Sequence, residues 1–152
     1  MAFSFKFQSI LDLKQRIEDQ KKSKYGEANE ELKNQKDKLN VLIEEREHQF
    51  ELMREKGKEG FTPKELIVYN NYMNRLKRSI EIQTVVVEKA KAAVEKARLE
   101  LVEAAKQRKM FETLREKKLE EYWEEYYKKE QAELDEVVSY KYNGGVKDGE
   151  ER

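Results

Sequence analysis

The chain has 152 residues, 42% of them charged and 38% hydrophobic, and its 32 basic and 32 acidic side chains leave no net charge. Six glycines, one proline and 10% aromatic residues are typical of long helices and coiled coils, whereas disordered chains combine high net charge with few aromatics. Without a basic surplus we expect no nucleic-acid partner, and without cysteine neither a disulfide nor a thiolate metal site can form.

The N-terminal stretch MAFSFKFQSILDLKQ is too polar for a signal peptide, because Lys6, Asp12 and Lys14 interrupt its apolar residues. No later stretch approaches the roughly 20 apolar residues that a membrane span needs. We therefore expect neither secretion by that route nor insertion into a membrane, and a cytoplasmic protein.

A first helix is expected over about residues 3–56. Its apolar stripe is interrupted by polar residues 20–24 and resumes beyond them, so we interpret the stretch as one helix. The stripe comprises Ile10, Leu13, Ile17, Tyr25, Ala28, Leu32, Gln35, Leu39, Leu42, Arg46 and Met53.

A turn is expected over residues 57–62, where Gly57 and Gly60 precede the only proline. Thr62 can cap a second helix that has Pro63 in its first position, and Glu65, three residues after Thr62, completes a capping box. The start of the second helix is therefore well marked.

The second helix is expected over about residues 63–142, with apolar residues at the alternating three- and four-residue spacing of a heptad seam. The seam comprises Leu66, Tyr69, Met73, Leu76, Ile80, Gln83, Val87, Ala90, Val94, Ala97, Leu101 and Ala104. The sequence thus predicts an all-α fold, a long antiparallel two-helix coiled coil in which the second helix overhangs the first. Residues 1–142 form one domain in this interpretation, and residues 143–152 a flexible tail.

The overhang contains the only tryptophan and several tyrosines within a segment rich in Glu and Lys, residues 116–137. Pairs four residues apart, Glu124–Lys128 and Glu125–Lys129, are predicted to support this helix. Tyr and Trp are favoured as interface anchors, so we expect a partner here. Alternatively, Phe3, Phe5 and Phe7 fold back onto the Leu119 and Tyr122 side and cover part of the aromatic surface.

No catalytic constellation is recognisable. His48 is the only histidine and lies among charged residues, and no glycine-rich phosphate loop is present. We expect no enzymatic activity, no catalytic residue, no cofactor and no metal.

The two ends of the chain resemble the FliJ family of flagellar type III export proteins. Matching positions at the start are Phe5, Lys6, Phe7, Gln8, Ser9, Ile10, Leu11 and Lys14, and at the end Glu116, Lys117, Glu130, Gln131, Leu134, Asp135 and Glu136. The resemblance spans nearly the whole chain, including the layout of two helices about a central turn.

This resemblance implies a stalk-like coiled coil that binds and stimulates the hexameric flagellar export ATPase, contacts the membrane export gate and serves export chaperones at the cytoplasmic face of the membrane. We assign ATPase binding, as a hypothesis, to the overhang: Tyr122, Trp123, Tyr126, Tyr127, Gln131, Leu134 and Asp135. The family's gate contact maps to Tyr72, Leu76, Ser79 and Gln83, although Leu76 is also a seam position whose simplest role is in the core.

Two alternatives stay open at this point. One is the equivalent stalk of a virulence type III secretion system, which shares the same physics. The other is a passive homodimeric coiled-coil scaffold, which would self-associate through the overhang, whereas we expect a stalk to be a monomer when alone.

Overall fold

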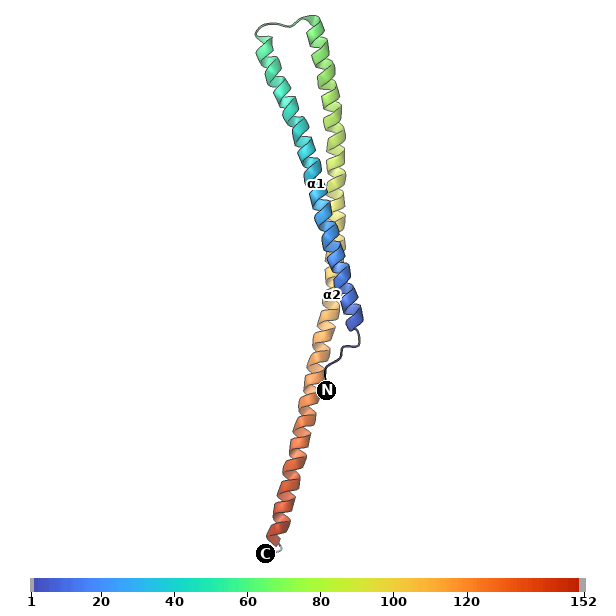
Figure 1. Ribbon diagram of the computed structural model, residues 1–152, viewed down its shortest axis with the longest axis vertical. Coiled ribbons are helices and arrows are strands. Elements are labelled where there is room, and N and C mark those ends of the chain that lie inside the picture. Colours follow the sequence, from blue (N-terminus) through green and yellow to red (C-terminus); the bar gives the residue numbers. More distant parts are fainter. Residues whose placement is uncertain (1, 151–152) are drawn as a thin grey trace. The chain divides into compact units, whose positions relative to one another are not determined.

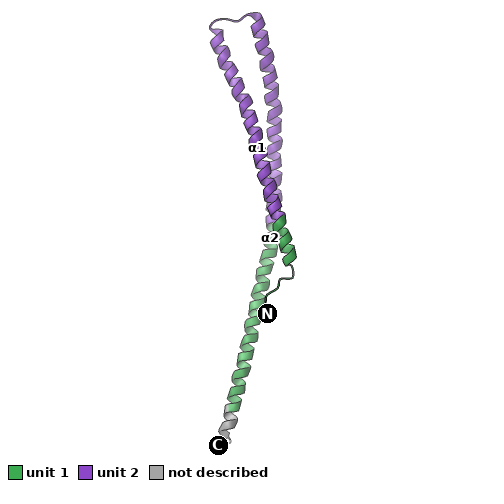
Figure 2. Cartoon of the chain, viewed as in Figure 1, with its two compact units in different colours: residues 1–16, 106–152 green, residues 17–105 purple. Residues whose placement is uncertain are grey.

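A computed structural model describes residues 2–150, with side chains described as far as residue 144. The described residues form two helices, α1 (Gln8–Gly57) and α2 (Pro63–Glu150), with non-helical residues 2–7 and 58–62 and no strand (Figure 1). The predicted all-α, two-helix hairpin is confirmed. The chain divides into two compact units, one of Met1–Arg16 with Lys106–Arg152 and one of Ile17–Ala105, here called unit 1 and unit 2 (Figure 2).

The helix ends differ from the expected ones at both termini. Helix α1 begins at Gln8 rather than near residue 3, because residues 2–7 leave the helix and turn, with the Gln8 N–H donating to the Phe5 carbonyl at 3.1 Å. Helix α2 continues past residue 142 to Glu150, and residues 151–152 lie outside the described part. The flexibility of residues 143–152 stays a prediction, as does the single domain over residues 1–142.

The turn between the helices has the chemistry that its residues predict. Gly60 adopts a φ of 93°, a left-handed conformation that side chains disfavour. The Glu65 N–H donates to Thr62 Oγ1 at 3.2 Å, and the Thr62 N–H donates to Glu65 Oε2 at 3.4 Å. This reciprocal capping box begins α2 at Pro63.

In unit 2, α1 and α2 pack antiparallel along the predicted seam. Leu76, Val87 and Ala104 are buried, and the other seam residues of α2 are half-buried except Leu66. Between seam positions, Ile82 and Val85 are 67% and 54% exposed. The heptad spacing therefore identifies the face of α2 that meets α1.

The predicted stripe of α1 is correct from Ile17 onward and wrong before it. Ile10 and Leu13 are exposed, whereas Leu11 is 9% exposed and is the buried residue of the first turns. The Leu11 N–H bonds to the Phe7 carbonyl at 2.9 Å, which places both residues on one side of the starting helix. The docking of the aromatic N-terminus thus selects the buried face at the start of α1.

No helix within the described residues is both long enough and apolar enough to span a bilayer.

Candidate functional site

Four consecutive ring contacts form a continuous aromatic surface on α2 in unit 1, made of Tyr122, Trp123, Tyr126 and Tyr127. Trp123 lies at the centre, with ring centroids 5.5 Å from Tyr122 and 5.6 Å from Tyr126, both edge to face. The Trp123 and Tyr127 rings are stacked at 5.9 Å with an interplanar angle of 29°. Such ring pairs hold one another in place, so the surface is ordered before any partner arrives.

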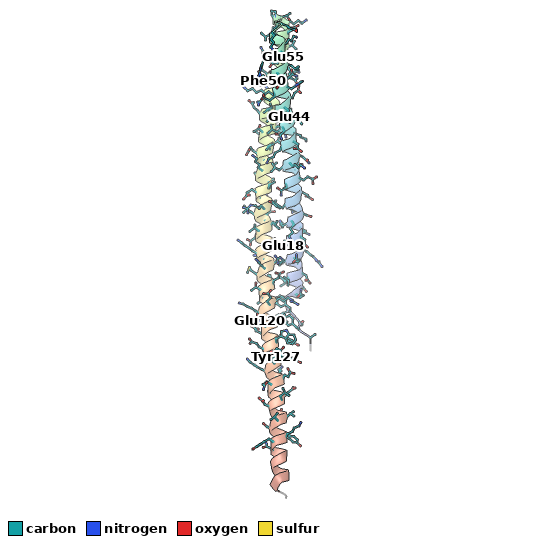
Figure 3. The ribbon with its side chains drawn as sticks, turned by 90° about the vertical axis from the view of Figure 1, so that its left-hand side faces the viewer. Glu18, Glu44, Phe50, Glu55, Glu120 and Tyr127 are labelled. Carbon is teal, nitrogen blue, oxygen red and sulfur yellow. The ribbon has the colours of Figure 1, made fainter. Side chains whose placement is uncertain are left out.

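Most of this aromatic surface is exposed to solvent. Trp123 is 45% exposed, Tyr126 46% and Tyr127 61%, while Tyr122 is half-buried. Figure 3 labels Tyr127 on the part of α2 that belongs to unit 1. Every described side chain from Trp123 to Asn143 is exposed, so no part of unit 1 covers this stretch.

The N-terminal segment, residues 2–7, packs against the other side of Tyr122. The Phe3 ring lies 5.6 Å from the Tyr122 ring, and the Arg115 guanidinium lies 5.6 Å from the centre of the Phe3 ring. The ring centroids of Phe7 and Phe111 lie 6.5 Å apart, and Phe5 is 8% exposed. Residues from the two ends of the chain therefore build one aromatic cluster.

This arrangement combines the two readings of the overhang that the sequence leaves open. The N-terminal phenylalanines fold back onto Tyr122, as one alternative predicts, but they leave Trp123, Tyr126 and Tyr127 uncovered. Of the remaining predicted residues, Leu134 is 56% exposed, and the Gln131 amide donates to Asp135 Oδ1 at 3.3 Å.

The predicted supporting pairs Glu124–Lys128 and Glu125–Lys129 are absent from the ion pairs of the described chain. Lys118 and Glu121, three residues apart, form a pair at 3.2 Å just before the aromatic surface. Exposed pairs four residues apart contribute only a few tenths of a kcal/mol, too little to hold long side chains against their rotational freedom. Within the described residues, Glu124 and Glu125 therefore form no ion pair, whereas Glu121 does.

The second predicted set lies in unit 2 and is largely engaged by α1. Leu76 is only 6% exposed, and the Gln83 amide donates to the Gln35 carbonyl at 2.9 Å and to Gln35 Oε1 at 2.8 Å. The Tyr72 hydroxyl donates to Glu45 Oε1 at 2.9 Å. Of the four predicted residues, only Ser79 is exposed.

The hydrogen bonds at Glu45 also alter its acidity. Bonds from the Gln49 amide and then from the Tyr72 hydroxyl lower the pKa of Glu45, and the same Glu45 carboxylate raises the pKa of Tyr72. Both shifts have the sign expected of a hydroxyl that donates to a carboxylate.

Several contacts across unit 2 were not foreseen from the sequence. Glu18 is only 4% exposed and pairs with Lys22 at 3.1 Å, although a carboxylate is seldom found at a buried position (Figure 3). Lys21 forms an ion pair with Glu100 at 3.2 Å, which lowers the pKa of Glu100. The interruption of the stripe at residues 20–24 was the available signal, because it places charge where α1 faces α2.

No group of three or more potential metal ligands comes together in the part of the chain that the structure describes.

Comparisons with known proteins match nearly the whole chain. The family model described as Flagellar FliJ protein matches residues 3–147. The Flagellar FliJ protein of Bacillus subtilis (strain 168) is 29% identical over 138 residues, which cover 90% of this chain and 93% of that protein. No solved structure matches.

Proposed function

Since the chain belongs to the flagellar FliJ family and is therefore associated with flagellar export, we propose that it is a stalk for the hexameric export ATPase. In this proposal it has no catalytic role of its own: it binds the ATPase ring, stimulates hydrolysis there and connects the ring to the export gate and to export chaperones. Its place of work is the cytoplasmic face of the membrane at the flagellar base.

The observation that carries the proposal is the exposed aromatic surface at Trp123, Tyr126 and Tyr127. These rings are ordered by contacts with one another, yet between 45% and 61% of each remains open to solvent. Aromatic side chains that are already ordered lose little conformational freedom on binding, and they dominate the energetics of many interfaces. We therefore assign ATPase binding to this surface, with Tyr122 as its edge.

The more distal residues extend the same proposed contact along α2. Gln131, Leu134 and Asp135 all lie on the exposed stretch, and Leu134 adds an apolar side chain that is 56% exposed. A stretch of helix that no other described residue of unit 1 covers can be surrounded by a ring of partner subunits, which a helix face packed against α1 cannot.

Contact with the export gate is the second part of the proposal, and the geometry limits how it can occur. Because Leu76 is buried and Gln83 bonds to α1, a gate segment would reach Ser79 and the accessible edge of Tyr72 while the helix pair stays closed. Direct contact with the buried side of Leu76 would require α1 and α2 to separate.

The first experiment uses Trp123, the chain's only tryptophan, as a reporter. Its emission is recorded while the cognate export ATPase is titrated into the purified chain under conditions in which the ring assembles, and hydrolysis is followed in parallel. We expect a blue shift that saturates at about one chain per ring, because Trp123 loses water contact on insertion, together with faster hydrolysis.

Matched variants show which surface is responsible. Tyr126→Ala/Tyr127→Ala should weaken ATPase binding at least tenfold, because truncating aromatic anchors commonly costs 2 kcal/mol or more, about the size of a hot spot. Ile82→Ala/Val85→Ala removes exposed apolar side chains from unit 2 and should leave binding unchanged. A free chain that is dimeric through residues 122–134, with Trp123 emission indifferent to the ATPase, would instead support a homodimeric scaffold and refute the stalk.

A further inference from the structure

A groove with an acidic lining runs along α2 in unit 1, beside the aromatic surface. It has a volume of about 310 Å³, and its lining residues are Tyr122, Glu125, Tyr126, Lys129, Glu130 and Glu133. Trp123 and Tyr127 do not line it, so the groove lies on a different side of the helix from the stacked pair. Two tyrosines, three glutamates and one lysine therefore line one hollow.

The charge of the groove is unbalanced, although the whole chain is neutral. Three carboxylates and one ammonium group give a local net charge of −2, that is, one minus three. Within the described residues, none of Glu125, Glu130 and Glu133 takes part in an ion pair, and Lys129 does not neutralise them. The groove thus presents unpaired negative charge next to aromatic faces.

This combination suits a cationic side chain, and an arginine above all. A guanidinium group can lie flat against a tyrosine ring while its N–H groups donate to neighbouring carboxylates in two directions. Lysine would satisfy the charge but not the stacking. An acidic or wholly apolar segment would leave the three carboxylates either repelled or stripped of water without a partner.

Tyr122, which lines the groove, also packs against the N-terminal segment. The Phe3 ring packs at 5.6 Å against Tyr122, and Arg115 lies over the Phe3 ring at 5.6 Å. The Tyr122 ring is therefore fixed by the N-terminal segment before a guest arrives, which reduces the ordering cost of binding.

We propose that this groove receives an arginine-bearing segment of the protein that docks on α2. The inference rests on the proposed function, in which that protein is the export ATPase, and adds the chemistry by which it is recognised. The guest arginine stacks on Tyr122 or Tyr126 and is held by Glu125, Glu130 and Glu133, beside the aromatic contacts made by Trp123 and Tyr127.

Neutralising the two distal carboxylates is the direct test. Glu130→Gln/Glu133→Gln keeps side-chain shape and avoids Glu125, which also lies near the N-terminal segment. The matched control is Glu27→Gln/Glu30→Gln, the same charge change at the same three-residue spacing, at exposed positions of α1 in unit 2. Affinity for the assembled ATPase is measured over a series of salt concentrations.

We expect the groove variant to bind the ATPase roughly tenfold more weakly than the wild type and with a flatter salt dependence, because it lacks charge-assisted contacts. The control should remain within about twofold of the wild type. The proposal is overturned if both variants bind the ATPase equally weakly, because this would indicate only a general electrostatic attraction. It is also overturned if the groove variant binds the ATPase as tightly as the wild type.

A peptide probe separates failure of this inference from failure of the stalk proposal. The full chain is titrated with an acetylated Leu-Arg-Arg-Leu-Arg-Arg-Leu peptide and with the same peptide carrying Gln in place of Arg, while the tyrosine ring signals are followed by NMR. Three results support the groove even if the ATPase does not bind. The arginine peptide shifts the signals of Tyr122 and Tyr126, it binds at least fivefold more tightly than the glutamine peptide, and its binding is lost in Glu130→Gln/Glu133→Gln.

Equal binding of both peptides, or shifts that persist in the groove variant, overturns the inference even if the ATPase binds at the aromatic surface. Sedimentation of the free chain tests whether a second copy of this chain occupies the groove. Self-association of the wild type that disappears in the groove variant would mean that a second copy of this chain fills the groove, and this also overturns the proposal.

Discussion

Truncating Phe5 should release the N-terminal segment from α2. The free energy gained by burying the rings of residues 2–7 only slightly exceeds the conformational entropy lost when these residues become ordered. Phe5 is 8% exposed, and a phenylalanine ring that buries about 150 Å² contributes about 3 to 4 kcal/mol at about 25 cal/mol/Å². Three rings on this scale supply at most about 12 kcal/mol, whereas ordering six residues costs about 6 to 12 kcal/mol. Phe5→Ala removes roughly 3 kcal/mol, enough to favour the undocked segment.

Amide hydrogen exchange and Trp123 emission measure this release. The Gln8 N–H donates to the Phe5 carbonyl, so its exchange in Phe5→Ala should accelerate by about a hundredfold if docking loses roughly 3 kcal/mol. Trp123 emission should shift to the red, because its neighbour Tyr122 loses the packing of the N-terminal segment.

Phe50→Ala is the matched control, since Phe50 is 43% exposed in unit 2 and its truncation should change neither signal. Unchanged Gln8 exchange in Phe5→Ala, or the same acceleration in Phe50→Ala, would refute the view that buried phenylalanines hold the N-terminal segment.

Three further predictions concern unit 2. Leu76→Ala should lower the free energy of unfolding by about 2 to 5 kcal/mol in urea titrations, whereas Ile82→Ala, at a position 67% exposed, should change it by less than about 0.5 kcal/mol; similar losses for both would contradict the assigned seam. Thr62→Ala should cost about 1 kcal/mol in the same assay by removing the cap of α2, and an unchanged midpoint would show that the capping bond contributes nothing. Tyr72→Phe should raise the pKa of Glu45 toward 4.5 in an NMR titration, because the Tyr72 hydroxyl no longer donates to the carboxylate. Since the pKa of Glu45 is depressed in the folded protein, this carboxylate stabilises the fold above pH 4.5, and the stabilisation is lost as the pH falls through the folded pKa. In Tyr72→Phe this pH-dependent loss of stability should be smaller. A Glu45 pKa that does not move in the variant would mean that the hydroxyl does not bond to the carboxylate in solution.

The aromatic surface shows how far a candidate site can be located from sequence. Trp123, Tyr126 and Tyr127 stand out because large aromatic residues occur among charges, beyond the point where the heptad seam of α2 ends. That pattern predicts exposure, and the structure confirms it. Which edge is covered could not be predicted, because Phe3 and Tyr122 are separated by more than a hundred residues and their contact depends on the path of a short non-helical segment.

Polar contacts were the least predictable part of unit 2. Gln35 and Gln83 both lie on predicted stripes, but only the register between α1 and α2 brings the Gln83 amide to the Gln35 carbonyl. Local charge spacing was equally uninformative for Glu125 and Lys129, which are four residues apart and yet form no ion pair within the described chain. The energies involved are a few tenths of a kcal/mol, so spacing alone does not decide such pairs.

The sequence by itself determined the two helices, the turn between them and the face of α2 that meets α1. These features depend on contacts within a few residues, on a capping box, and on a repeat whose period is set by helix geometry. The tertiary structure alone decided that residues 2–7 leave α1, that Leu11 rather than Ile10 is buried, and that Tyr122 has a covered side and a side facing an acidic groove. Those outcomes depend on contacts between distant residues whose burial outweighs the local preference for continuing the helix, and no periodicity records such a competition.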